Sequence, residues 1–295
     1  MALMPNVYNP NMAAILNSEL SIFRKFIHIP SYVKHPTGNI EAINFITSHL
    51  ESIGFKIQIR GDELSEQPTI VAKYLGHKSN RKVVIYGHYD VALVKDSKNW
   101  VSDDPFTLEE VEGRVYGRGI ADNKGPLLSR IQAITELIKS DKPVPQILWL
   151  IQGEEEIIEG ERVAHKVFKN EIPSFGANLY IEETGFNDLV TNEQIAFLWS
   201  RSVPEKQLYK WHSLLNNSLN QPRIEFRHLN KLNGIEACPL LSNLPQNSIY
   251  IGFGPNDKLH NIHQDNESLA KSKLLQHKNQ FKKFITLFAE ATDVE

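Results

Sequence analysis

The sequence is poor in cysteine, with Cys238 as the single one among 295 residues. One thiol cannot form an intrachain disulfide or a cysteine-rich zinc site, so any metal would be held by His, Asp and Glu side chains. No apolar run approaches the ~20 residues that span a bilayer. The first residues also lack a basic segment followed by an apolar one, which argues against a signal peptide. We therefore expect a soluble, cytoplasmic protein.

An excess of positive charge is absent as well. Lys and Arg total 32 against 35 Asp and Glu, a net charge of −3 at pH 7 with His neutral, and no block of basic residues stands out. Nucleic acids and anionic membranes attract clustered positive charge. We predict neither as a partner, and expect a small molecule or a peptide as the substrate.

The hydrophobic pattern predicts an α/β protein. Hydrophobic residues make up 41% and charged residues 23% of the chain, which is enough to bury a substantial core. Helical spacing of apolar residues alternates with short apolar runs that are typical of buried strands. This alternation favours a single-domain α/β/α sandwich with a mixed, largely parallel central sheet. We expect a loose lead-in over residues 1–11 and one domain over residues 12–295.

The positions of the elements follow from the same pattern. Helical spacing predicts helices within about 15–30, 37–54, 122–138 and 274–288. Short apolar runs predict strands at 55–60, 70–75, 83–87, 146–151, 178–181, 195–200 and 248–252. The connection over residues 92–118 reads as long and irregular.

Several of the predicted strands end in residues that can bind metal. His88 follows the run that starts at Val83, with Asp90 two residues later. One histidine after a strand is more often an ordinary loop residue, but other predicted strand and loop ends offer Asp122, Glu154 to Glu156, Glu182, Glu183 and His263. Carboxylates and imidazoles suit zinc, manganese or cobalt. Adjacent glutamates repel one another unless a cation compensates, so together these residues indicate a metal site.

Five motifs then occur in order along the chain. They are Gly87-His88-Tyr89-Asp90-Val91, Trp100 with Asp104-Pro105-Phe106, Tyr116-Gly117-Arg118-Gly119 with Asp122, Gly153-Glu154-Glu155-Glu156, and His263-Gln264-Asp265-Asn266-Glu267. Their order and spacing resemble the two-metal exopeptidase and deacylase family that includes aminoacylase, carnosinase, glutamate carboxypeptidase and succinyl-diaminopimelate desuccinylase. The resemblance spans roughly residues 15–290.

The resemblance implies a role for each matching residue. His88 would bind one metal ion with its ring oriented by Asp90, and Asp122 would bridge two ions. Glu155 would be the general base and Glu156 a ligand, although a slip to Glu154 and Glu155 stays open because Ile157-Ile158 stands where the family often has Gly. Two further ligands complete the set: Glu183, with Glu182 as the alternative, and His263.

These residue types also make chemical sense without the family. A carboxylate offers two oxygens and can bridge two ions, whereas an imidazole offers one lone pair. Two divalent ions lower the pKa of a water molecule from ~15.7 toward ~7. A glutamate that binds no metal can accept a proton during attack and return it to the leaving amine. Two metal ions and a glutamate base are groups that suit the hydrolysis of an amide bond, and we expect the metal to be zinc.

Members of this family usually carry an inserted lid domain, and here the room for one is missing. Residues 195–202 resemble the strand before the insertion and residues 233–237 the returning segment, which leaves residues 202–232, a count of 31. A separate domain normally needs at least ~40 residues. We expect one helix within 204–217 and one short strand within 223–229, and no lid. Because the lid mediates dimer formation in relatives, we expect a monomer, and His260 or His228 to replace the lid's oxyanion donor.

Three readings of function remain open. The first is an exopeptidase or N-acyl-amino-acid deacylase, and the second an aminopeptidase that takes longer or bulkier substrates through an open site. The third is an inactive metal-binding scaffold that serves as an interaction module. Glu182 or Asp265 could bind a substrate ammonium, and Arg201, Arg227 or Lys258 a substrate carboxylate. The retained Glu155 favours an enzyme, since a scaffold needs no general base.

Overall fold

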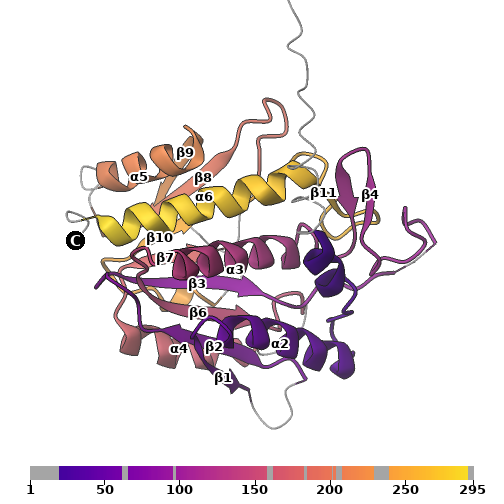
Figure 1. Ribbon diagram of the computed structural model, residues 1–295, viewed down its shortest axis with the longest axis horizontal. Coiled ribbons are helices and arrows are strands. Elements are labelled where there is room, and N and C mark those ends of the chain that lie inside the picture. Colours follow the sequence, from indigo (N-terminus) through magenta and orange to yellow (C-terminus); the bar gives the residue numbers. More distant parts are fainter. Residues whose placement is uncertain are drawn as a thin grey trace, which may run out of the picture.

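The computed structural model describes residues 20–61, 66–95, 98–157, 162–182, 185–200, 202–203, 208–228 and 239–291. Its centre is an eight-stranded sheet in the order β1-β2-β6-β3-β7-β10-β8-β9 (Figure 1). The strands are β1 (Lys56–Arg60), β2 (Thr69–Tyr74), β3 (Lys82–His88), β6 (Gln146–Gln152), β7 (Leu179–Glu182), β8 (Ile195–Ser200), β9 (Arg223–His228) and β10 (Ile249–Gly252). The predicted sandwich around a mixed sheet is confirmed, and every strand expected from the sequence is present within a residue or two.

The four middle strands of the sheet run in the same direction. β3 pairs in parallel with β6 and with β7, and β7 pairs in parallel with β10. β2 and β8 flank them in antiparallel pairing. Parallel strands are buried on both faces, which is why these strands read as continuous apolar runs. Their carboxyl ends meet at one edge of the sheet.

Helices cover both faces of the sheet (Figure 1). One face carries α2 (Pro36–Glu51), α3 (Lys124–Lys139), α5 (Tyr209–Leu219) and α6 (Lys271–Glu290), together with helical residues 20–27. The other face carries α4 (Ala164–Phe175). None of the helices described is both long and apolar enough to cross a membrane.

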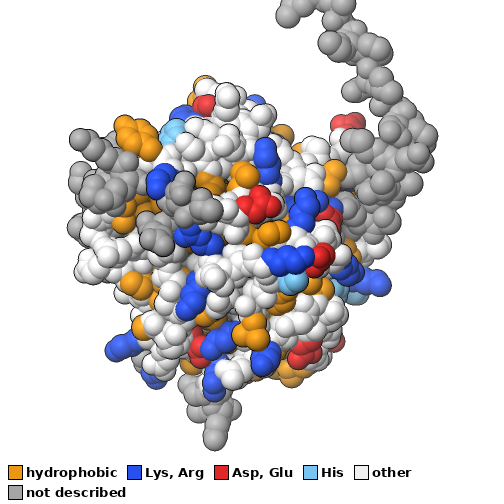
Figure 2. Space-filling model, turned by 60° about the vertical axis from the view of Figure 1, so that its left-hand side comes forward, with side chains coloured by type: hydrophobic (Ala, Val, Ile, Leu, Met, Phe, Trp, Pro, Cys, Tyr) orange, Lys and Arg blue, Asp and Glu red, His pale blue; other side chains and the backbone are white. Residues whose placement is uncertain are grey.

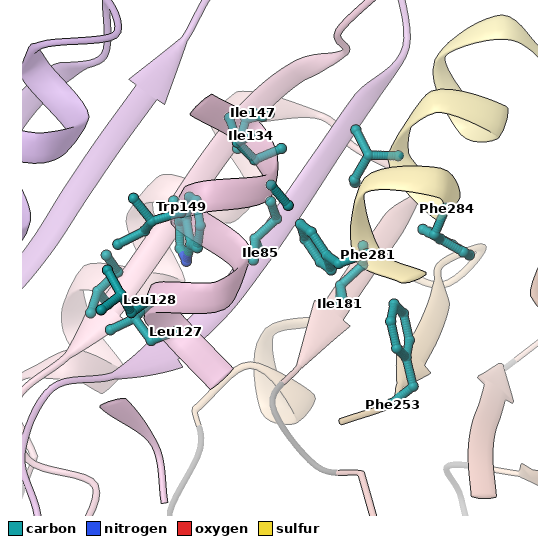
Figure 3. Close-up of a cluster of buried hydrophobic side chains, with 14 of the residues drawn as sticks. Ile85, Leu127, Leu128, Ile134, Ile147, Trp149, Ile181, Phe253, Phe281 and Phe284 are labelled. Atoms are coloured by element: carbon teal, nitrogen blue, oxygen red, sulfur yellow. The ribbon is translucent and has the colours of Figure 1, made fainter. Parts of the chain in front are cut away.

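Successive residues of the central strands pack alternately into two separate hydrophobic cores. In β3, Val83 and Ile85 join the core under α3 and α6, while Val84 and Tyr86 join the core under α4. Figure 3 shows the first core, where Ile85 and Trp149 of the sheet face Leu127 and Phe281 of the helices. On the outer surface in Figure 2, hydrophobic side chains form small separate patches among charged ones. Burial on both faces fixes the strand register, because a one-residue slip would exchange the two cores.

The connection over residues 92–118 is more ordered than the sequence suggests. It contains a hairpin of β4 (Glu109–Val111) and β5 (Arg114–Tyr116), which is joined by β11 (Ser268–Ala270) into a three-stranded sheet. The turn residues Glu112 and Gly113 have φ of 51° and 77°. Positive φ at both positions is the geometry of a type I′ hairpin turn. Three-residue strands give too short a pattern for prediction from the sequence.

The described part of residues 202–232, where the sequence leaves little room for a lid, adds to the main sandwich. It consists of α5 and β9, the helix and strand expected from the sequence. β9 pairs in parallel with β8, and the Trp211 ring of α5 lies 5.9 Å from the Phe288 ring of α6. These elements extend the sheet and one helix layer. The expected lead-in over residues 1–11 lies outside the described residues.

Candidate active site

The described members of the predicted ligand set gather at the carboxyl ends of the parallel strands. His88 is the last residue of β3, and the run Glu154 to Glu156 begins two residues after β6 ends. Asp122 stands just before α3, and His263 lies in the loop between β10 and β11. Sites in open α/β sheets form at this edge because loops from neighbouring strands converge there.

His88 is held on both sides of its ring. Its Nδ1 lies 3.1 Å from the backbone oxygen of Asp90 and 3.3 Å from Asp90 Oδ1. Only a protonated nitrogen can bond to these oxygens, so Nδ1 carries a hydrogen and Nε2 points away. Nε2 lies 3.0 Å from Asp122 Oδ1. The other Asp90 oxygen accepts the Glu156 backbone N–H at 2.9 Å, which links two of the motifs.

Asp122 lies between the two histidines. Its Oδ1 faces His88, and its Oδ2 lies 3.3 Å from His263 Nε2. The same nitrogen of His263 is 3.0 Å from Glu156 Oε2. Ligand atoms of His88, Asp122 and Glu156 all lie within 4.8 Å of one another. The structure thus brings together four of the predicted metal-binding residues, with one carboxylate in contact with both imidazoles.

Negative charge dominates this cluster and shifts the pKa values of its members. Burial raises the pKa of Glu156 to about 7 against the opposing hydrogen bond from His263. Contacts with Asp122 and Glu156 raise the pKa of His263 to about 10. Burial alone would lower the pKa of His88, but Asp122 and Asp90 outweigh it and leave the pKa well above its usual range. Burial also opposes ionisation of Asp122, yet both imidazoles hold its pKa well below the usual value.

The neighbouring acids of the run point in different directions. Glu154 is buried, and its Oε2 accepts the Ala164 backbone N–H at 3.3 Å, at the start of α4. Burial raises the pKa of Glu155, with the charges of Asp122 and Asp90 adding to the shift and that of His88 opposing it. Arg162 donates to the backbone oxygens of both glutamates and so fixes the run. No pattern in the sequence pointed to this arginine.

Glu267, the last residue of the motif that begins at His263, is fully buried. Burial raises the pKa of its carboxyl, while the Arg118 guanidinium and the nearby backbone amides pull it down. Arg118 Nη1 donates to Glu267 Oε2 at 2.7 Å. Glu267 belongs to the motif His263 to Glu267, but the sequence alone predicted no role for it.

The remaining predicted residues lie in several different environments. Glu183, Arg201 and the side chains of Arg227 and His228 lie outside the described residues. Glu182 is 3% exposed, and its backbone oxygen accepts a hydrogen bond from Arg130 Nη2. His260 is half-buried, which lowers its pKa, and Asp122 is among the charges that act on it. Lys258 is exposed, and Asp265 lies 3.5 Å from Asn99 Nδ2.

Three comparisons with known proteins show what this chain is similar to. Among curated relatives, a Beta-Ala-His dipeptidase of Rattus norvegicus is 35% identical over 117 residues, which are 39% of this chain and 23% of that protein. A succinyl-diaminopimelate desuccinylase of Rickettsia canadensis is 36% identical over 125 residues, which are 41% of this chain and 32% of that protein. The chain thus spans between a fifth and a third of the length of these relatives. Human carnosine dipeptidase 1 superposes with a TM-score of 0.72 at 12% identity, over 96% of this chain and 99% of that chain.

A family model settles the classification. The model described as peptidase family M20/M25/M40 matches residues 84–287, more than half of the chain. This match contains every predicted site residue. By its sequence, and in agreement with the fold, the chain belongs to peptidase family M20/M25/M40.

Proposed function

We propose that the chain is a metal-dependent hydrolase that cleaves an amide bond, as an exopeptidase or an N-acyl-amino-acid deacylase. The observation that carries this proposal is the position of Asp122, whose two carboxylate oxygens face His88 on one side and His263 on the other. One carboxylate shared by two imidazoles suits a two-metal site, because each of its oxygens can bind a different ion. Family membership supports the same reaction class.

The donor atoms fit two divalent cations. Because His88 Nδ1 carries its hydrogen toward Asp90, the Nε2 lone pair of the neutral ring would face the lone pairs of Asp122 Oδ1. His263 Nε2 likewise faces two carboxylates. A cation bound between these groups would displace the imidazole protons and be coordinated by both partners. His88 and Asp122 would hold one ion, with Glu183 as a further ligand from the motif, and Asp122, Glu156 and His263 the other.

Zinc is the ion we propose, because imidazole with carboxylate is a common zinc donor set and manganese or cobalt can share it. Such ions supply positive charge that polarises a carbonyl group and lowers the pKa of water. Asp90 orients His88 through the Nδ1 hydrogen bond, a contact that raises the basicity of the ligating nitrogen. Glu155 then takes a proton from the attacking water and gives it to the leaving amine nitrogen.

The geometry supports Glu155 and Glu156 as the base and ligand pair over Glu154 and Glu155. Glu156 contacts His263, as a ligand of the same ion would. Glu154 instead caps the start of α4 through Ala164. Glu155 shares its electrostatic environment with His88 and Asp122, although no ligand contact with them is described. A base needs this placement, close to the cluster without being part of it.

We also propose that the chain works without a lid domain. The described part of residues 202–232 forms α5 and β9, both within the main sandwich. An uncovered site would admit long or bulky substrates. The expected monomer remains a prediction, which light scattering on the eluting peak of a sizing column tests: a stable dimer contradicts it.

The reaction class is tested with a panel of dipeptides, tripeptides with free or blocked termini, and N-acyl-amino acids. We expect zinc, manganese or cobalt to support hydrolysis of at least one member, and a chelator to abolish it. A preference for a free amino terminus identifies an aminopeptidase, and a preference for a free carboxyl terminus identifies a carboxypeptidase or deacylase. If the folded, zinc-loaded chain cleaves nothing on the panel, the proposal is wrong and a binding role replaces it.

The affinity of the chain for zinc is expected to rise with pH. Glu156, with its pKa raised to about 7, and the two imidazoles, with pKa values raised above the ordinary one, bind protons that zinc must displace. Each displaced proton weakens binding roughly tenfold per pH unit below the pKa of its group. Competition against a chromogenic chelator at pH 6, 7 and 8 measures this slope. An affinity that is flat or falls across this range contradicts the assignment of these ligands.

A further inference from the structure

We propose that Glu267 is a positioning residue that fixes the bridging Asp122 through its backbone. This inference rests on the proposed function, because it takes Asp122 as a metal ligand. The Glu267 carboxylate accepts four hydrogen bonds. Oε2 accepts Arg118 Nη1 at 2.7 Å and the Gly119 N–H at 3.0 Å, and Oε1 accepts the Ala121 N–H at 2.8 Å and the Asp122 N–H at 2.9 Å.

The four donors require an ionised carboxylate. Two donors face each oxygen, so no lone pair is left for a proton. Glu267 is fully buried and Arg118 is 2% exposed. A buried charge pair of this kind adds little net stability, because desolvation offsets the attraction between its members. The pair instead fixes geometry, because one buried anion holds the backbone amides of Gly119, Ala121 and Asp122 in place.

The motif from His263 to Glu267 therefore contacts Asp122 at two points. His263 contacts the Asp122 side chain at Oδ2, and Glu267, four residues later, holds the Asp122 backbone N–H. His263 and Glu267 lie in the same loop. Their two contacts therefore set the distance between the Asp122 carboxylate and His263. Arg118 strengthens it, since Nη2 donates to the Gln264 oxygen and the guanidinium lies 5.3 Å from the Trp100 ring.

Glu267→Gln tests this inference with almost no change of shape. An amide keeps one acceptor oxygen and replaces the other by an NH2 group. Whichever way the amide turns, NH2 faces two donors, so either Ala121 and Asp122 or Arg118 and Gly119 lose their acceptor. We expect zinc affinity to fall ~10–100-fold, as for other residues that hold metal ligands in place. The matched control is Glu110→Gln, which breaks the ion pair between Glu110 of β4 and Lys271 at the start of α6 and leaves the four hydrogen bonds of Glu267 in place.

Two measurements separate positioning from a general loss of fold. Titration with zinc alone, against a chelating indicator, gives the affinity and stoichiometry of the folded variant. Hydrogen exchange on the metal-free protein reports the amides of Ala121 and Asp122, which we expect to exchange at least ~10-fold faster in Glu267→Gln while core amides of β3 stay protected. Zinc affinity and loop exchange equal to those of wild type and Glu110→Gln would overturn the inference.

A second variant covers the case in which Glu267→Gln does not fold. Glu267→Asp keeps the charge but is shorter by one methylene, so it cannot reach Arg118 and the Asp122 amide together. The same loss of zinc affinity is expected, and wild-type affinity in this variant would overturn the inference as well. If wild type binds zinc but hydrolyses nothing, the proposed reaction fails while the role of Glu267 stands on the binding and exchange data.

Discussion

Glu155→Gln is expected to lower kcat by ~10²–10⁴-fold, the usual contribution of a general base, while zinc binding stays at the wild-type level. Glutamine matches the shape of glutamate but cannot accept a proton. Glu155 is buried enough to have a raised pKa and lies in the field of Asp122 and Asp90, with no described contact to a ligand atom. Its loss should therefore affect proton transfer and leave the metal site intact. Steady-state kinetics together with zinc titration measure both quantities.

The neighbouring Glu154→Gln supplies the matched control. Its Oε2 accepts a hydrogen bond from Ala164 at the start of α4, and a glutamine oxygen can accept the same bond. We expect activity within a few-fold of wild type. The opposite result, with Glu154→Gln inactive and Glu155→Gln active, would show that the base and ligand are Glu154 and Glu155.

Asp122→Asn is expected to have the largest effect of any single substitution, because it acts on both proposed ions. The asparagine oxygen can still face one imidazole, but the NH2 group then faces the other and repels a cation there. The negative charge that lowers the cost of holding two cations is lost too. We expect zinc stoichiometry to drop from two per chain to one or none, and hydrolysis to fall below the level of Glu155→Gln. Elemental analysis after dialysis gives the stoichiometry.

A surface substitution of the same kind controls for the loss of an aspartate. Asp141 is exposed and pairs with His77 and Lys78 at a distance from the cluster. Asp141→Asn should keep two zinc ions and wild-type activity, since exposed ion pairs contribute little. If Asp122→Asn also keeps two ions bound with wild-type affinity, Asp122 does not bridge them.

Much of the fold was predictable because burial on both faces leaves a strong signal. β3 and β6 have apolar residues on each face, so their runs are continuous and easily recognised. The site was predictable for a related reason. His88 and the Glu154 to Glu156 run stand at the ends of such strands, where polar residues contrast with the run before them. Asp122 and His263 lie in loops, where the sequence marked them as candidates and the motif resemblance implied their roles as ligands.

Other parts of the site depend on contacts between residues far apart in the chain. Glu267 meets the Gly119 and Asp122 amides across nearly 150 positions, and no local pattern marks that contact. Arg162 is another case, because it acts through the backbone oxygens of Glu154 and Glu155. The β4–β5 hairpin was missed since its strands are three residues long.

The most direct test of a site bridged by Asp122 is anomalous diffraction at the zinc absorption edge from crystals of the zinc-loaded chain. We expect two peaks that share Asp122 as a ligand, one also next to His88 and the other also next to Glu156 and His263. A single peak, or peaks that do not include Asp122, would contradict the two-metal site from which the proposed hydrolysis is derived.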